Sequence, residues 1–336
     1  MTSLERGSPA AIFQTQLRHI DKLLMKAKRA RAFKDRAFAV QFRASLFKLE
    51  GWAKIHRHWP NKKEQKIFAS IRDHAKKLED CLAALDVALS MAADLTKRKQ
   101  PAIALIFEER AKKAQRELKH QLHDADWFSD GETRVEKMIK SLGRVDWPSV
   151  DRQISYLEKA LVKDVNSVNE DFRGEWKPKL LSPNYNRDIV ENALHKFRRQ
   201  LRWFPIYFQT AEGIFGLGPL PNVLTSEKRK LVADYENNPF ARLPKSKNNR
   251  YLIDRIAYYQ LTRLIDQVGE IKDKAESYIY LRDALIKSGD SELKAAERAQ
   301  VVYGQAPEET PIATHKLLAE YERFKPLAYI GQSLQS

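Results

Sequence analysis

The residues whose types and spacing most clearly suggest a binding site are four basic side chains on one face of the stretch 194–204. An α-helix turns about 100° per residue, so one face about 100° wide carries all four: His195, Arg198, Arg199 and Arg202. The opposite side carries Leu194, Phe197, Leu201, Phe204 and Phe208. Like charges three or four residues apart on a helix repel one another, so this face predicts a bound anion or neutralising carboxylates.

A second group of basic residues lies in the first fifty positions. Four of them fall on one face of a predicted first helix: Arg18, Lys22, Lys26 and Arg29. Only Asp21 and Asp35 are acidic in this neighbourhood. The spacing is typical of a row of phosphate contacts, and equally of a well-solvated outer face. Arg43 and Lys48 add two basic residues to the next predicted helix.

The composition favours an anionic partner. The 336 residues include 60 Lys and Arg against 44 Asp and Glu, a formal net charge of +16. The single cysteine, Cys81, excludes an intramolecular disulfide. The first residues have no secretory-signal pattern, and no apolar run approaches the roughly 20 residues that cross a bilayer. We therefore expect a soluble, cytoplasmic protein without a membrane span.

The hydrophobic spacing predicts an all-α fold, because apolar residues recur at helical intervals and strict alternation is absent. Predicted helices cover about 10–33, 35–58, 63–97, 101–125, 133–142, 149–168, 187–212, 250–288, 290–303 and 311–325. Longer loops are expected at 171–186 and 213–249. A break at 143–149 divides the chain into an N-terminal helical bundle, 1–145, and a C-terminal bundle, 146–336.

A weak internal repeat supports two related halves. The segment 40–49 aligns with 195–204, matching Phe42 with Phe197 and Arg43 with Arg198. We expect the two helices that carry these segments to face one another. Pro205 lies just beyond the second copy and removes a backbone donor, so a kink or a restart of the helix is expected there.

At these residues the sequence resembles the CHAD family, the conserved histidine α-helical domain. Its motif, His-x-x-Arg-x-x-x-(Lys/Arg)-(Lys/Arg), is matched at His195, Arg198 and Arg202, whereas Trp203 occupies the last basic position. The first copy departs from the motif, since Val40 replaces the histidine and Phe47 the first basic residue. The resemblance implies two pseudo-repeated antiparallel four-helix bundles packed side by side.

The resemblance also implies a function without catalysis. Family members bind inorganic polyphosphate or a similar polyanion in a basic cleft between the bundles, which would require no cofactor. The expected polyanion-binding residues are His195, Arg198, Arg199, Arg202, Arg43, Lys48, Arg18, Lys22, Lys26 and Arg29. Two alternatives stay open: a scaffold that binds an acidic protein, and an RNA-binding protein that uses the same basic residues.

Other residue clusters give weaker indications of chemistry. His120 and His123 are three residues apart on a predicted helix, and His56 and His58 flank Arg57. Two ligands from one helix do not complete a metal site, and an arginine beside a histidine pair repels a cation, so no metal is expected. No nucleophile motif is visible, and the acidic residues around Glu109 are interleaved with basic ones as on a solvated helix.

Overall fold

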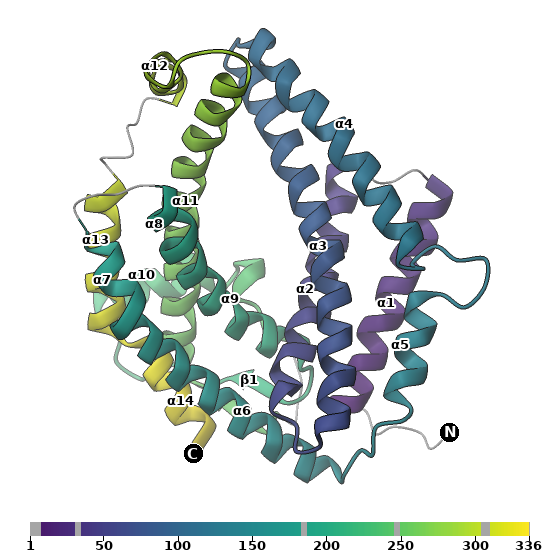
Figure 1. The fold of residues 1–336 in the computed structure, drawn as a ribbon. Coiled ribbons are helices and arrows are strands. Elements are labelled where there is room, and N and C mark those ends of the chain that lie inside the picture. Colours follow the sequence, from purple (N-terminus) through teal and green to yellow (C-terminus); the bar gives the residue numbers. More distant parts are fainter. Residues whose placement is uncertain (1–7, 31–34, 183–186, 245–248, 304–309, 336) are drawn as a thin grey trace. The chain divides into compact units, whose positions relative to one another are not determined.

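A computed structural model describes residues 8–30, 35–182, 187–244, 249–303 and 310–335. The described chain is built almost entirely of helices, with one pair of three-residue strands (Figure 1). The expected all-α class is therefore confirmed. By its internal contacts the chain forms two compact units, residues 1–160 and 161–336. The predicted pair of four-helix bundles stays a prediction.

The first unit is a set of long helices that pack along one another (Figure 1). It contains α1 (Pro9–Ala30), α2 (Arg36–Ile55), the 3-10 turn η2 (His56–His58), α3 (Lys62–Lys97), α4 (Pro101–Asp124), α5 (Arg134–Leu142) and the first half of α6 (Val150–Asp171). The helix α3 packs against both α2 and α4, and α5 packs against α1 and α3.

Local sequence signals explain where these helices begin. Asp35 accepts a hydrogen bond from the backbone of Ala37 at 2.8 Å, and Asn61 accepts one from Lys63 at 2.9 Å. Pro101 occupies the first turn of α4, where its missing N–H costs nothing. Thr133 and Glu136 form a reciprocal capping box at the start of α5. Each cap satisfies amides that the helix itself leaves unpaired.

The second unit is organised around the long helix α11 (Arg255–Lys287). The remaining elements are η3 (Phe172–Trp176), α7 (Lys177–Leu180), α8 (Arg187–Ile189), η4 (Val190–Leu194), α9 (His195–Thr210), β1 (Phe215–Leu217), α10 (Ser226–Tyr235), η5 (Pro239–Ala241), β2 (Tyr251–Ile253), α12 (Glu292–Tyr303), α13 (Thr310–Phe324) and α14 (Pro326–Gln335). The helices α9, α10, α12, α13 and α14 all contact α11.

Several predicted boundaries in this unit were wrong. The expected loop at 171–186 is largely helical as far as Leu180, and the expected loop at 213–249 contains β1, α10 and η5. The strands β1 and β2 pair in parallel, with Phe215 opposite Tyr251, so the helix predicted from 250 begins at Arg255 instead. Three-residue strands are too short to produce a visible alternation of polar and apolar residues.

The expected restart of the helix at Pro205 does not occur, because α9 is continuous from His195 to Thr210. Pro205 itself is buried, and so are Phe204 before it and Tyr207 and Phe208 after it. Burial of these side chains offsets the cost of the missing hydrogen bond, about 3 kcal/mol for a proline inside a helix.

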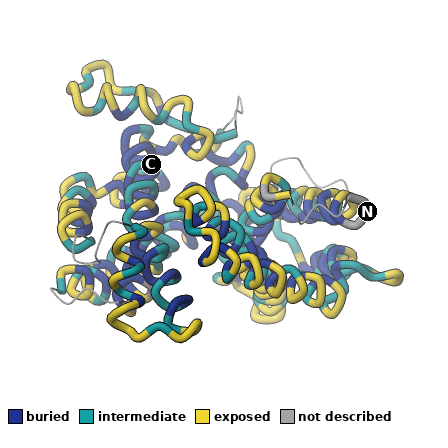
Figure 2. The backbone as a smooth tube through the Cα atoms, turned by 90° about the horizontal axis from the view of Figure 1, so that it is seen from above, coloured by how far each residue is buried: buried dark blue, intermediate teal, exposed yellow. Residues whose placement is uncertain are grey.

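In both units the apolar residues lie on the inner sides of the helices. Figure 2 shows buried and exposed positions alternating along each helix, as an amphipathic pattern requires. In α1, for example, Leu17 and Ile20 are fully buried, whereas Lys22 and Lys26 are exposed. The core therefore fixes which faces carry the basic residues.

Candidate polyanion-binding surface

Three lysines of the first unit form what we call the lysine cluster: Lys22 and Lys26 on α1, and Lys48 on α2. Lys22 and Lys26 are exposed and Lys48 is half-buried. Within the described residues, none of the three forms an ion pair with a carboxylate. Because α1 packs directly on α2, the cluster combines charge from two helices.

His19 reports the electrostatics of the lysine cluster. The pKa of His19 is lowered, first because the ring is partly buried, and then because Lys48, Lys22 and Lys26 each repel a proton on it. Three ammonium groups thus act on one imidazole. The same positive potential would attract an anion.

The two arginines predicted beside the lysine cluster are less informative. Arg18 lies one turn before Lys22 on α1 and is exposed. Arg29 lies in the last turn of α1, but its side chain is outside the described part of the structure. The carboxyl group of Asp21 has a raised pKa because of its burial and the nearby Glu136.

Arg43 lies within an internal ion-pair network. Its Nε donates to Oε1 of the buried Glu79 at 2.5 Å, and its Nη1 lies 3.2 Å from Oδ2 of Asp86. The guanidinium also lies over the ring of Phe47, 5.5 Å from the ring centroid. Both carboxylates come from α3, so Arg43 ties α2 to α3.

His195 lies near a carboxylate group on another helix. Its Nδ1 lies 3.7 Å from Oε1 of Glu276 on α11, and Lys272 donates to the other oxygen of Glu276 at 2.8 Å. Burial acts to raise the pKa of Glu276, but the nearby imidazole of His195 and the ammonium of Lys272 lower it overall. Glu276 is therefore held as a carboxylate between two basic residues.

Arg198 packs against the backbone of α11. Its Nε donates to the carbonyl oxygen of Ile265 at 3.3 Å. A methyl group at Gly269 would lie 2.7 Å from Nη2 of Arg198, so the absence of a side chain at Gly269 makes room for the guanidinium. The charge of Arg198 also acts to lower the pKa of Asp266, although burial raises that pKa overall.

Arg199 and Arg202 are both partly exposed on α9. The guanidinium of Arg199 lies over the indole of Trp203, 5.8 Å from the ring centroid. Both arginines make further interactions within the fold.

The structure thus brings some predicted site residues together and commits others to internal contacts. The charges of Lys22, Lys26 and Lys48 all act on the imidazole of His19, whereas Arg43 forms ion pairs with two carboxylates on α3. The aligned arginines of the internal repeat, Arg43 and Arg198, each contact the longest helix of their own unit. Sequence reasoning missed His19, and it missed the acids on the long helices. The spacing of Glu79 and Asp86, seven residues apart on one helix face, was an available signal.

His56, one of the histidines considered as metal ligands, lies in the core of the first unit. His56 is fully buried, and its Nδ1 donates to the carbonyl oxygen of Trp52 at 2.7 Å. Aromatic rings surround it, with the centroids of Phe13 and Phe68 at 5.0 Å and 5.2 Å. This burial lowers the pKa of His56 to about 4, so the ring is neutral. No group of three or more potential ligands that could hold a metal occurs among the described residues.

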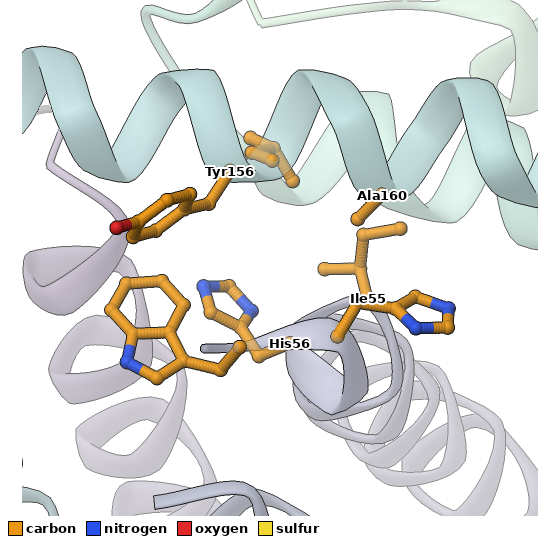
Figure 3. A pocket seen from close by; sticks show the side chains of 7 residues that line it. Ile55, His56, Tyr156 and Ala160 are labelled. Carbon is orange, nitrogen blue, oxygen red and sulfur yellow. The ribbon is translucent and has the colours of Figure 1, made fainter. Parts of the chain in front are cut away.

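A cavity of about 10 Å³ adjoins His56, about the space of one water molecule. Figure 3 shows Tyr156 and Ala160 on α6 pointing toward Ile55 and His56 across this cavity. An opening this small cannot admit a phosphate chain. The cavity therefore belongs to the packing of the first unit.

No family model, no curated protein and no solved structure matches the chain. The resemblance to the CHAD family therefore stays a prediction. Among the described helices, none is long and apolar enough to cross a membrane.

Proposed function

We propose that the chain binds a polyanion without performing chemistry on it, and that inorganic polyphosphate is the favoured ligand. The observation that carries the proposal is the lysine cluster, in which three lysines from α1 and α2 each act to lower the pKa of His19 and have no ion-paired carboxylate among the described residues. The net charge of +16 supports it, because long-range attraction steers a polyanion to the protein.

Lysine suits this role on chemical grounds. Each ammonium is a compact charge on a flexible stem with three donors, so it follows phosphate oxygens along a chain without a fixed geometry. Neutralising several phosphates also releases condensed counterions, which strengthens binding at low salt. Arg18 extends the row on α1, and Arg199 and Arg202 offer partly exposed cations in the second unit.

The preference for polyphosphate comes from the resemblance of residues 195–202 to the CHAD motif. The runner-up ligands are RNA and an acidic protein, which the same basic residues would contact. Salt dependence alone does not separate polyphosphate from RNA, because both ligands lose affinity as salt rises.

The test is direct competition at physiological salt. Labelled long-chain polyphosphate is bound to the full chain, and its fluorescence anisotropy is followed as unlabelled polyphosphate, single-stranded RNA, double-stranded RNA or polyglutamate is added. We expect unlabelled polyphosphate to displace the probe at the lowest concentration of charged groups. Stronger displacement by RNA would overturn the choice of ligand, and no binding of any of them would overturn polyanion binding itself.

A further inference from the structure

A second basic feature of the first unit lies between α3 and α5 and shares no residue with the lysine cluster. It is a pocket of about 250 Å³ with a basic and hydroxyl-bearing lining. The polar lining consists of Lys66, Ser70, His74, Arg134, Lys137 and Ser141. Ile71 and Met138, both buried, contribute its apolar part.

The pocket keeps an excess of positive charge. Arg134 and Lys137 share one carboxylate, Asp126, with Oδ2 of that residue 3.4 Å from Nη2 of Arg134 and 2.7 Å from Nζ of Lys137. Lys66 is exposed and forms no ion pair within the described residues. Two arginine or lysine charges out of three therefore lack a compensating carboxylate in the pocket.

His74 is held in one orientation by its own helix. Its Nδ1 lies 2.7 Å from the carbonyl oxygen of Ser70, and since a carbonyl only accepts, Nδ1 carries the proton. The other ring nitrogen, Nε2, has no hydrogen-bond partner among the described residues.

The volume limits the ligand. Pockets for drug-sized molecules measure about 300 to 1,000 Å³, so this pocket takes a smaller compound. A planar guanidinium, two ammonium groups and the hydroxyl of Ser70 are the donors that phosphate oxygens accept from, whereas the hydroxyl of Ser141 already donates to the carbonyl oxygen of Lys137 at 2.8 Å. The Nε of Arg134 donates to the carbonyl oxygen of Ala125 at 2.8 Å, and the guanidinium has further N–H donors for a ligand.

We propose that this pocket binds a small phosphorylated compound, the size of a diphosphate or a sugar phosphate. Lys66 and Lys137 supply charge, Arg134 supplies directed donors, and His74 presents its Nε2 to the ligand. The site is separate from the lysine cluster, and it binds one compact ligand rather than a long chain.

The probe is inorganic pyrophosphate, and its binding to the full chain is measured by isothermal titration calorimetry at about 0.15 M salt. Lys66→Gln removes the exposed cation without breaking an ion pair, and we expect the Kd to rise about ten-fold, as for loss of one charged hydrogen bond. Lys97→Gln is the matched control, an exposed lysine on the same helix about 45 Å along its axis at 1.5 Å per residue. We expect it to change the Kd less than two-fold.

A second measurement follows ligand binding at the pocket in the wild-type chain, so a change in the stability of a variant cannot affect it. The Cε1 proton of His74, identified by its loss in His74→Gln, should shift in the NMR spectrum as pyrophosphate is added. The proposal is overturned if pyrophosphate does not bind at millimolar concentration, if the two lysine variants weaken binding equally, or if the His74 signal does not move.

This proposal and the proposed function fail separately. Lys22→Gln, Lys26→Gln and Lys48→Gln combined should leave pyrophosphate affinity within two-fold of the wild type. Conversely, Lys66→Gln should change affinity for long-chain polyphosphate less than two-fold. If the triple variant abolished pyrophosphate binding, the pocket would not be the pyrophosphate site.

Discussion

Acidification should destabilise the first unit through one residue, His56. The ring is fully buried among aromatic side chains, and its pKa in the folded chain is about 4, against 6.5 for an ordinary histidine. Between these two pH values the unfolded chain binds a proton that the folded chain does not. The free energy of unfolding is therefore highest above pH 6.5 and falls as the pH drops towards 4.

The size of this effect follows from the two pKa values. A difference of about 2.5 corresponds to about 3 kcal/mol, at about 1.36 kcal/mol for each tenfold change in proton affinity. Carboxylates with lowered pKa, such as those of Asp126 and Glu136, add their own loss of stability at low pH. The contribution of His56 is isolated by comparing the wild type with His56→Phe.

His56→Phe keeps an aromatic ring in the cluster and removes the titrating group. At pH 7 we expect it to lower the free energy of unfolding by about 1 kcal/mol, because the hydrogen bond to the carbonyl oxygen of Trp52 is lost. At pH 4.5 the variant should equal or exceed the wild type in stability, because it has no ring to protonate on unfolding.

The assay is urea unfolding followed by tryptophan fluorescence at several pH values between 4.5 and 7.5. Four of the six tryptophans lie in residues 1–160, so the signal reports mainly on the first unit. His120→Gln, an exposed change on α4, controls for the loss of a histidine. The reasoning is refuted if the pH curves of the wild type and His56→Phe run parallel to within about 0.5 kcal/mol.

Three further predictions concern the basic residues. Arg43→Gln should lower the free energy of unfolding by about 3 kcal/mol in urea titration, because the buried Glu79 loses its partner, and Glu79→Gln should recover part of the loss; unchanged stability would contradict this. Gly269→Ala should lower the melting temperature because its methyl group displaces Arg198, and adding Arg198→Gln should raise it again, whereas a further decrease would argue against the contact. Polyphosphate affinity should increase as the solution is made more acidic than pH 6.5, because a bound anion raises the pKa of His19 from its lowered value. The variant His19→Gln should flatten this dependence in calorimetric titrations.

The sequence predicted the helical class well because apolar spacing records which side of a helix is buried. Leu17 and Ile20 on α1, and Phe197 and Leu201 on α9, occupy the predicted inner faces. Boundaries with a local cause were also predictable, as at Pro101, which begins a helix. The short strands and α14 were missed, because their positions depend on tertiary contacts such as the pairing of Phe215 with Tyr251.

The candidate site was harder to predict, since helix geometry shows which face carries a cation but not what lies opposite. Arg43 and Arg198 read alike in the sequence as binding residues. In the fold, Arg43 contacts Glu79, and Arg198 contacts the carbonyl oxygen of Ile265, 67 positions away in the chain. Lys22 and Lys48 became a cluster only because α1 packs on α2. Contacts between residues so distant in sequence are not encoded by local spacing.

The central claim is that the lysine cluster binds a polyanion, and the salt dependence of binding tests it most directly. Each phosphate contact contributes about 0.7 to 0.9 to the slope of log K against log salt concentration. For long-chain polyphosphate, the variant carrying Lys22→Gln, Lys26→Gln and Lys48→Gln should therefore have a slope smaller in magnitude by about 2 to 3 than the wild type. The control variant carries Lys97→Gln, Lys99→Gln and Lys119→Gln, which remove the same charge from exposed positions of the same unit, and its slope should change by less than 1. Equal slopes for the two triple variants would contradict a binding site at the lysine cluster.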